Sequence, residues 1–150
     1  GFDVSNERLS DLPFDELEIH FLTLARLFFL TFHRPERHGW ISAFRCAQDY
    51  SGARKGPLIA KSVLDVVDAM QRVRGSGFSY CDPFCKGCSA YVTTEERYLI
   101  SAVHHLRRNA PQVAATNAMM LCEGADHVTF LAMVGQLIGV AEDDCVRYAL

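Results

Sequence analysis

Three cysteines stand close together in a stretch that has the composition of a loop. Cys81, Cys85 and Cys88 follow the spacing C-x3-C-x2-C in residues 81–88, called the cysteine segment below. Pro83 and Gly87 allow the backbone to turn sharply enough to aim the three sulfurs at one point. Thiolates held so close repel one another unless a cation neutralises them, so this spacing predicts a metal site.

A structural zinc site is nearly always tetrahedral, so three cysteines require a fourth ligand from elsewhere in the chain. We expect residues 94–109 and 111–123 to form an antiparallel helical hairpin, with a tight break between the two helices. That hairpin brings Cys122 back to the start of its first helix, a few residues from Cys88. Cys122 is therefore the predicted fourth ligand, and the alternatives are His127, Asp82 and Cys145.

Zinc is the preferred metal because the proposed site is a closed clip between a loop and two helices, with no evident electron-transfer partner. A four-cysteine iron-sulfur cluster is the alternative that the ligand type allows. The spacing also resembles the cluster-binding motif of the radical S-adenosylmethionine enzymes, which carry it early in a repeated β/α barrel. Here 80 residues of mostly helical pattern precede Cys81, so the rest of the chain does not fit that family.

Cys85 and Cys88 also form a C-x2-C pair, which is typical of thiol–disulfide chemistry. A thioredoxin-like site would need a βαβ pattern around the pair, and none is visible. The C-x2-C spacing still leaves a thiol-based redox sensor as an alternative function. Short disulfide scaffolds are poor in core, whereas this chain is rich in apolar helical periodicity. We therefore expect reduced cysteines and a cytoplasmic location, with Cys46 and Cys145 as small buried apolar residues.

Composition limits the partners. The chain has 150 residues, is 49% hydrophobic and carries a net charge of −3, which favours one continuous core and no broad positive field. Nucleic acid is therefore disfavoured, and a DNA-binding regulator using the basic turn at residues 33–38 is a second alternative. The apolar run at residues 17–32 is interrupted by Glu18, His20 and Arg26, so no membrane span is predicted. No secretory signal pattern is found.

Helical periodicity dominates the chain, and period-2 alternation is almost absent, so the predicted class is all-α. About six helices are expected in one domain. The first begins at the Asp11–Glu16 start signal, and the others cover 40–51, 57–73, 94–109, 111–123 and the residues after Asp126. N-terminal helices at 11–75 and C-terminal helices at 93–150 flank a cysteine-rich loop at 76–92, between helices three and four.

No catalytic motif is present: the chain has neither H-E-x-x-H nor a glycine-rich phosphate loop. His104, His105, Arg107 and Arg108 are interpreted as cations in a last helical turn, which the helix dipole favours. The predicted function is therefore a small non-enzymatic zinc protein, acting as an adaptor or regulator through a protein partner or a homodimer. No small-molecule substrate is evident.

Overall fold

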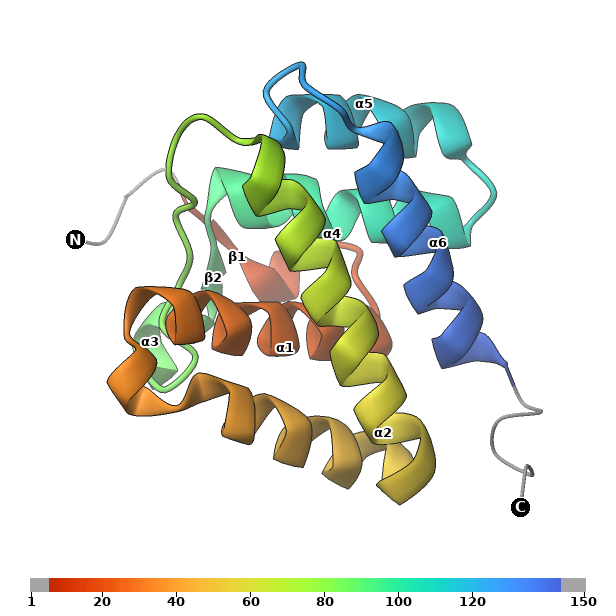
Figure 1. Ribbon diagram of the computed structural model, residues 1–150. Helices are drawn as coiled ribbons and strands as arrows, with labels where there is room; N and C mark the ends of the chain where they lie inside the picture. Colours follow the sequence, from red (N-terminus) through yellow and green to blue (C-terminus); the bar gives the residue numbers. More distant parts are fainter. Residues whose placement is uncertain (1–5, 144–150) are drawn as a thin grey trace.

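The structure, a computed structural model that describes residues 6–143, is built almost entirely from helices. The helices are α1 (Glu16–His33), α2 (Gly39–Val73), α3 (Lys86–Ser89), α4 (Thr94–Arg107), α5 (Pro111–Leu121) and α6 (Val128–Glu142), with 3₁₀ turns η1 (Leu9–Asp11) and η2 (Pro35–Arg37). The predicted all-α class is confirmed (Figure 1). An antiparallel pair of two-residue strands, β1 (Glu7–Arg8) and β2 (Tyr91–Val92), was not predicted because such short strands carry no period-2 signal.

Helix α1 packs against both α2 and α4 and is buried on nearly every side. Asp15 begins it with a capping box: its carboxylate accepts the Glu18 amide at 2.9 Å, and the Glu18 carboxylate accepts the Asp15 amide at 3.1 Å. Phe28 and Phe29 are among the largest fully buried side chains of the chain. A helix that is apolar on nearly every side belongs in the centre of a bundle.

Helix α2 consists of two helical stretches that meet at a kink at Gly52, next to the predicted end of the helix at residue 51. Gly52 has φ of 93° in an otherwise helical run, and this left-handed backbone bends the helix sharply (Figure 1). After the bend the chain returns close to itself: a Cβ atom on Gly56 would lie 2.6 Å from the Cα of Gln48 and 2.7 Å from the Ala47 oxygen. The two halves therefore approach too closely at Gly56 for any side chain.

The predicted hairpin forms from α4 and α5. Thr93 caps α4, since its hydroxyl accepts the Glu96 amide and the Glu96 carboxylate accepts the Thr93 amide, both at 3.0 Å. Helix α5 ends with Cys122 as its C-cap, and both Glu123 and Gly124 have left-handed backbone. Glu123 therefore occupies the C′ position in the left-handed conformation, and Gly124 follows it.

Helix α6 follows the predicted pattern. The N-cap of α6 is His127, and the carboxylate of the preceding Asp126 accepts the free amides of Val128 at 3.0 Å and Thr129 at 3.2 Å. Phe130, Val134 and Leu137 point inward and are fully buried. One apolar core is shared by α1, α2, α4, α5 and α6. No helix in residues 6–143 is long and apolar enough to cross a membrane.

The start of α1 and the end of α4 are joined by charges. The buried Glu18 carboxylate lies 2.9 Å from His104 Nδ1 and accepts hydrogen bonds from Arg107 at 2.6 Å and Arg108 at 2.7 Å. Burial would raise the pKa of Glu18, but hydrogen bonds from Arg108 and His104 outweigh it and hold the pKa below its ordinary value. The sequence predicted that these cations interact favourably with the dipole of α4. Their main partner in the structure is the carboxylate of Glu18.

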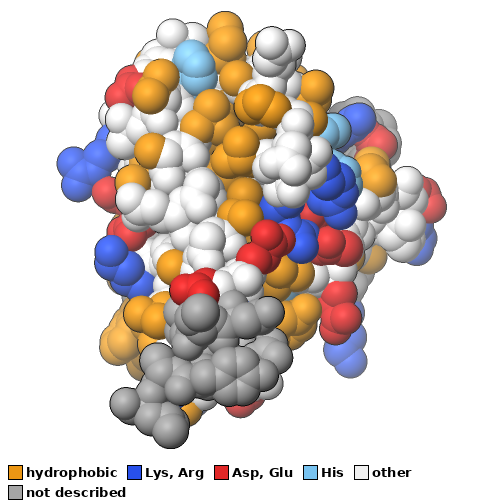
Figure 2. All heavy atoms as spheres, turned by 90° about the vertical axis from the view of Figure 1, so that its right-hand side faces the viewer, with side chains coloured by type: hydrophobic (Ala, Val, Ile, Leu, Met, Phe, Trp, Pro, Cys, Tyr) orange, Lys and Arg blue, Asp and Glu red, His pale blue; other side chains and the backbone are white. Residues whose placement is uncertain are grey.

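Figure 2 shows basic and acidic side chains lying beside one another on the side of the molecule where α4 ends. Arg107 also contacts Asp15 at 2.7 Å and Glu142 at 2.8 Å, so one guanidinium connects α1, α4 and α6. A buried carboxylate is costly unless it is paired and hydrogen-bonded, and this cluster supplies both conditions for Glu18.

Candidate functional site

The cysteine segment is held at both ends by one buried ion pair. Arg26 of α1 is 3% exposed and Glu96 of α4 is 0% exposed, with Nε and Oε2 2.5 Å apart and a second hydrogen bond of 3.1 Å. Glu96 also accepts the Cys81 amide at 3.2 Å, while Arg26 donates to the carbonyls of Ser89 at 3.1 Å and Tyr91 at 2.6 Å. The pair therefore determines where the segment leaves the core and where it returns.

Between these anchors, the single turn of α3 brings Cys85 and Cys88 together. Cys85 is the N-cap of α3, and its sulfur accepts the Cys88 amide at 3.3 Å. The two sulfurs are 2.8 Å apart, compared with about 2.0 Å in a disulfide bond. Both residues are partly exposed, so a dissolved reactant can reach them.

Hydrogen bonding makes these two thiols unequal. The Cys88 thiol, with the amides of Cys88 and Gly87, lowers the pKa of Cys85 below the ordinary thiol value. The pKa of Cys88 is raised, because its proton is shared with the Cys85 sulfur and because of partial burial. The thiolate is the reactive form of cysteine, so Cys85 is the better nucleophile and Cys88 is placed to react second.

Cys81 has a different environment, although it belongs to the same motif. It is 8% exposed, and its pKa is raised to about 12, first by burial and then by the nearby charge of Glu96. A thiol with such a pKa stays protonated at neutral pH, whereas the thiolate is the reactive form. Cys81 is therefore a poor nucleophile while Glu96 remains beside it.

Cys122 lies in the core at the end of α5, where burial raises its pKa. The carbonyl of the preceding Leu121 accepts a 2.6 Å hydrogen bond from Arg74, and Glu123 accepts the amides of Gly75 and Ser76. These contacts attach the end of α5 to the end of α2. In Figure 1 the joined ends of α2 and α5 lie near the top of the view, whereas α3 lies on the left beside the end of α1.

The structure brings Cys85 and Cys88 together, and Cys81 lies near enough to Cys88 for the two thiols to interact electrostatically, whereas Cys122 lies in the core at the end of α5. Within residues 6–143, no group of three or more His, Cys, Asp or Glu side chains is arranged to hold a metal ion. Of the alternative ligands, Asp82 pairs with Arg37 at 3.6 Å, His127 precedes α6, and Cys145 lies outside the described residues. The zinc site stays a prediction for metal analysis to test.

The outer side of the cysteine segment packs on η2. The Arg37 guanidinium lies 5.2 Å from the ring centre of Phe84, a side chain that is 52% exposed. Pro83 and Phe84 form one wall of an apolar groove of about 580 Å³, called the segment groove below. Its other wall comes from α1 and α2 and includes Leu27, Cys46 and Tyr50.

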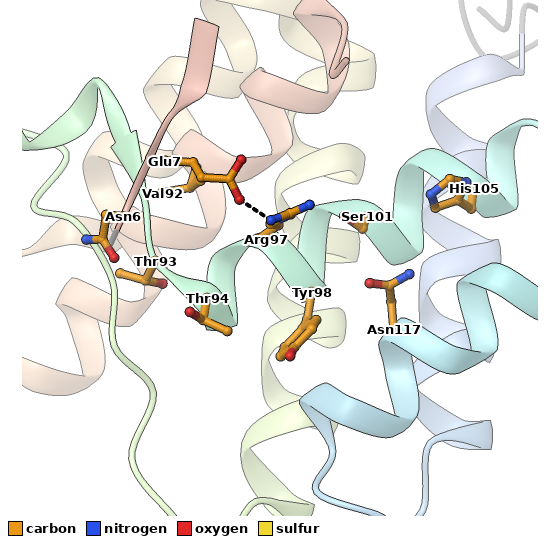
Figure 3. Close-up of a pocket in the computed structure, with 10 residues that line it drawn as sticks. All are labelled: Asn6, Glu7, Val92, Thr93, Thr94, Arg97, Tyr98, Ser101, His105 and Asn117. Carbon is orange, nitrogen blue, oxygen red and sulfur yellow. Dashed lines mark hydrogen bonds and ion pairs between the residues drawn. The ribbon is translucent and has the colours of Figure 1, made fainter. Parts of the chain in front are cut away.

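A second cavity, of about 430 Å³, lies along α4 and is lined mostly by polar side chains; it is called the α4 pocket below. Figure 3 shows Arg97, Ser101 and His105 on successive turns of α4, with Asn117 of α5 across from them. Glu7 of β1 forms an ion pair with Arg97 at one end of this series of side chains. The sequence did not single out this pocket, because its residues come from three separated segments.

In the sequence, Arg26 stands out only as an interruption of an apolar run. One signal could have indicated more: a charged side chain in the middle of an apolar helix is almost never buried without a partner. The sequence does not identify the carboxylate that pairs with Arg26, because that depends on how α1 and α4 pack against each other.

Searches against protein-family models, curated proteins and solved structures give no match to this chain.

Proposed function

We propose that the protein is a thiol-based redox-responsive protein in which Cys85 and Cys88 interconvert between a dithiol and a disulfide. The observation that supports this most is the 2.8 Å separation of the two sulfurs on an exposed turn. The lowered pKa of Cys85 adds a reactive thiolate on one side of the pair. Firm anchors at both ends of the segment keep the two thiols adjacent.

The reaction is thiol–disulfide exchange with a disulfide-containing oxidant. The Cys85 thiolate attacks one sulfur of that disulfide, which forms a mixed disulfide and releases the first thiolate of the oxidant. Cys88 then loses its proton to water and attacks Cys85 Sγ, which forms the Cys85–Cys88 bond and releases the second thiolate. Two electrons pass from the pair to the oxidant, and its two thiolates take up the two protons that the cysteines lost.

Oxidation would act on the surface and leave the core unchanged. Arg26 and Glu96 hold the segment at Cys81 and Ser89, so any change in backbone conformation on disulfide formation would be confined to the residues between these two anchors. Phe84 directly precedes Cys85 and forms part of the segment groove. Exposed aromatic side chains are enriched at protein interfaces, so we propose that a protein partner reads the redox state at this groove.

The test compares wild type with three variants: Cys85→Ser, Cys88→Ser and the control Cys46→Ser. Each protein is equilibrated in glutathione buffers of graded potential, its free thiols are alkylated, and the product is mapped by mass spectrometry. Wild type and Cys46→Ser should lose two thiols and form the Cys85–Cys88 disulfide. Cys88→Ser should accumulate a glutathione adduct at Cys85, because the second step is blocked.

Two outcomes would reject the proposal. One is a pair that stays reduced across potentials from about −300 to −150 mV, the range that spans cellular compartments. The other is a disulfide that joins a different pair of cysteines.

A structural zinc site formed by Cys81, Cys85, Cys88 and Cys122 is the second candidate. Cys85 and Cys88 supply two adjacent sulfurs, and Cys88 is close enough to Cys81 to contribute to its raised pKa. Elemental analysis and thermal melting of wild type and Cys122→Ser test it. Zinc that is lost in the variant supports the four-cysteine site, whereas full retention with unchanged melting rejects Cys122 as a ligand. Broad visible absorption would favour the iron-sulfur alternative.

A further inference from the structure

We infer that the α4 pocket binds a free α-amino acid with a polar, uncharged side chain. Its volume of about 430 Å³ falls within the usual range of small-molecule sites, about 300 to 1,000 Å³. Most such sites are lined by apolar side chains, but this lining is mainly polar, so a polar ligand fits it better than a lipid or an aromatic compound. None of its residues takes part in the proposed redox chemistry, so this inference stands independently.

The Ser101 hydroxyl is open to the pocket. Ser101 lines the pocket, and no side chain or backbone group among residues 6–143 hydrogen-bonds its hydroxyl. Three helical threonines, Thr23, Thr31 and Thr116, instead donate to the carbonyl four residues earlier. The Ser101 hydroxyl therefore keeps its donor and acceptor capacity for a polar group that enters the pocket.

Opposite charges stand side by side at one end of the pocket. Arg97 and Glu7 pair there, and their side chains are about half exposed, so solvent weakens their attraction and the pair can open at little cost. An amino acid carries a matching set of charges. Its carboxylate can take both N–H groups of the Arg97 fork, and its ammonium can bind Glu7, so neither protein charge is left unpaired.

Farther along the pocket the groups are neutral hydrogen-bonding side chains. Asn117 donates one amide hydrogen to the Val113 carbonyl at 2.9 Å, which leaves its oxygen and second hydrogen for a ligand. His105 lies beyond it, and burial together with His104 and Arg108 lowers its pKa, which favours the neutral ring. Ser101, Asn117 and His105 can therefore bind an amide or hydroxyl side chain without demanding a charge.

The test measures binding of L-glutamine and L-serine by NMR shifts of α4 amides and by calorimetry. Two probes each remove one charge from glutamine: glutaramate lacks the ammonium, and 4-aminobutanamide lacks the carboxylate. Binding of at least one of the two amino acids is expected, with both probes about tenfold weaker or worse than glutamine. Arg97→Gln should weaken amino-acid binding about tenfold, and Ser101→Ala about fivefold, with unchanged circular dichroism.

Lys61→Gln, which removes an exposed charge on α2, is the matched control and should leave the affinity unchanged. The inference is overturned if neither amino acid binds at concentrations up to about 10 mM. It is also overturned if glutaramate binds as tightly as glutamine, which would indicate a simple anion site. Repeating the titration on Cys85→Ser separates the two proposals, because equal affinity is expected whether or not the redox pair is present.

Discussion

Arg26 Nε lies 2.5 Å from Glu96 Oε2, although 70 residues separate the two in the chain and both side chains are buried. This contact joins α1 to the first turn of α4. The same two side chains bind the backbone at Cys81, Ser89 and Tyr91, where the cysteine segment begins and ends. The geometry of the reactive turn thus depends on a charge pair in the core.

Removing one partner of this pair should be strongly destabilising. Arg26→Met leaves the Glu96 carboxylate buried without its cation, and we expect the free energy of unfolding to fall by about 3–5 kcal/mol. Urea unfolding followed by circular dichroism measures this. The matched control Arg72→Met breaks an exposed pair with Asp68 and should not change stability measurably. Equal stability of Arg26→Met and wild type would show that the pair is not what anchors the segment.

The cysteines should react with iodoacetamide in a definite order. Cys85 should be alkylated first, because its lowered pKa and partial exposure combine thiolate character with access. Cys81 and Cys122 should react only after unfolding, since both are buried and burial raises their pKa values. Time-resolved mass mapping of the native protein at neutral pH gives the order. Early labelling of Cys81 would contradict the environment described for it.

His20 should make stability depend on pH in a defined window. Its ring is buried and stacked on Tyr50 with ring centres 4.0 Å apart, and burial lowers its pKa from 6.5 to about 4. Between these values the unfolded chain binds more protons than the folded one, so the free energy of unfolding falls as the pH drops from 6.5 toward 4. The contribution of His20 is fully present above pH 6.5.

Urea unfolding at a series of pH values measures this slope. His20→Phe keeps an aromatic ring against Tyr50 but cannot be protonated, so it should reduce the slope in this window. His33→Gln, at an exposed position, is the control and should keep it. A slope that is the same in wild type and His20→Phe would assign the pH dependence to other groups.

Two glycine substitutions should act in opposite directions. Gly56→Ala forces a Cβ atom against the backbone of Ala47 and Gln48, and we expect a loss of about 1–3 kcal/mol in the free energy of unfolding. Gly139→Ala on α6 meets no atom within 4 Å, so the lower entropy of the unfolded chain should stabilise the protein by about 0.4–1 kcal/mol. Thermal and urea unfolding of both variants provide the comparison. A neutral Gly56→Ala would mean that the two halves of α2 can move apart.

Several features were predictable because their signals lie within a few residues of one another. The capping box at Thr93 and Glu96 is read directly from T-x-x-E, and the inward positions Phe130, Val134 and Leu137 follow from helical spacing. The strand pair and the contacts of His104 were not predictable in this way. Both depend on segments more than 80 residues apart meeting in space.

The cysteine segment separates the two kinds of information. The C-x2-C spacing by itself determined that Cys85 and Cys88 stand together, because one turn of backbone is enough to join them. Only the tertiary structure decided the environments of Cys81 and Cys122, which lie beside Glu96 and in the core at the end of α5. Burial and long-range charges control the pKa of a thiol, and both arise only when the helices dock.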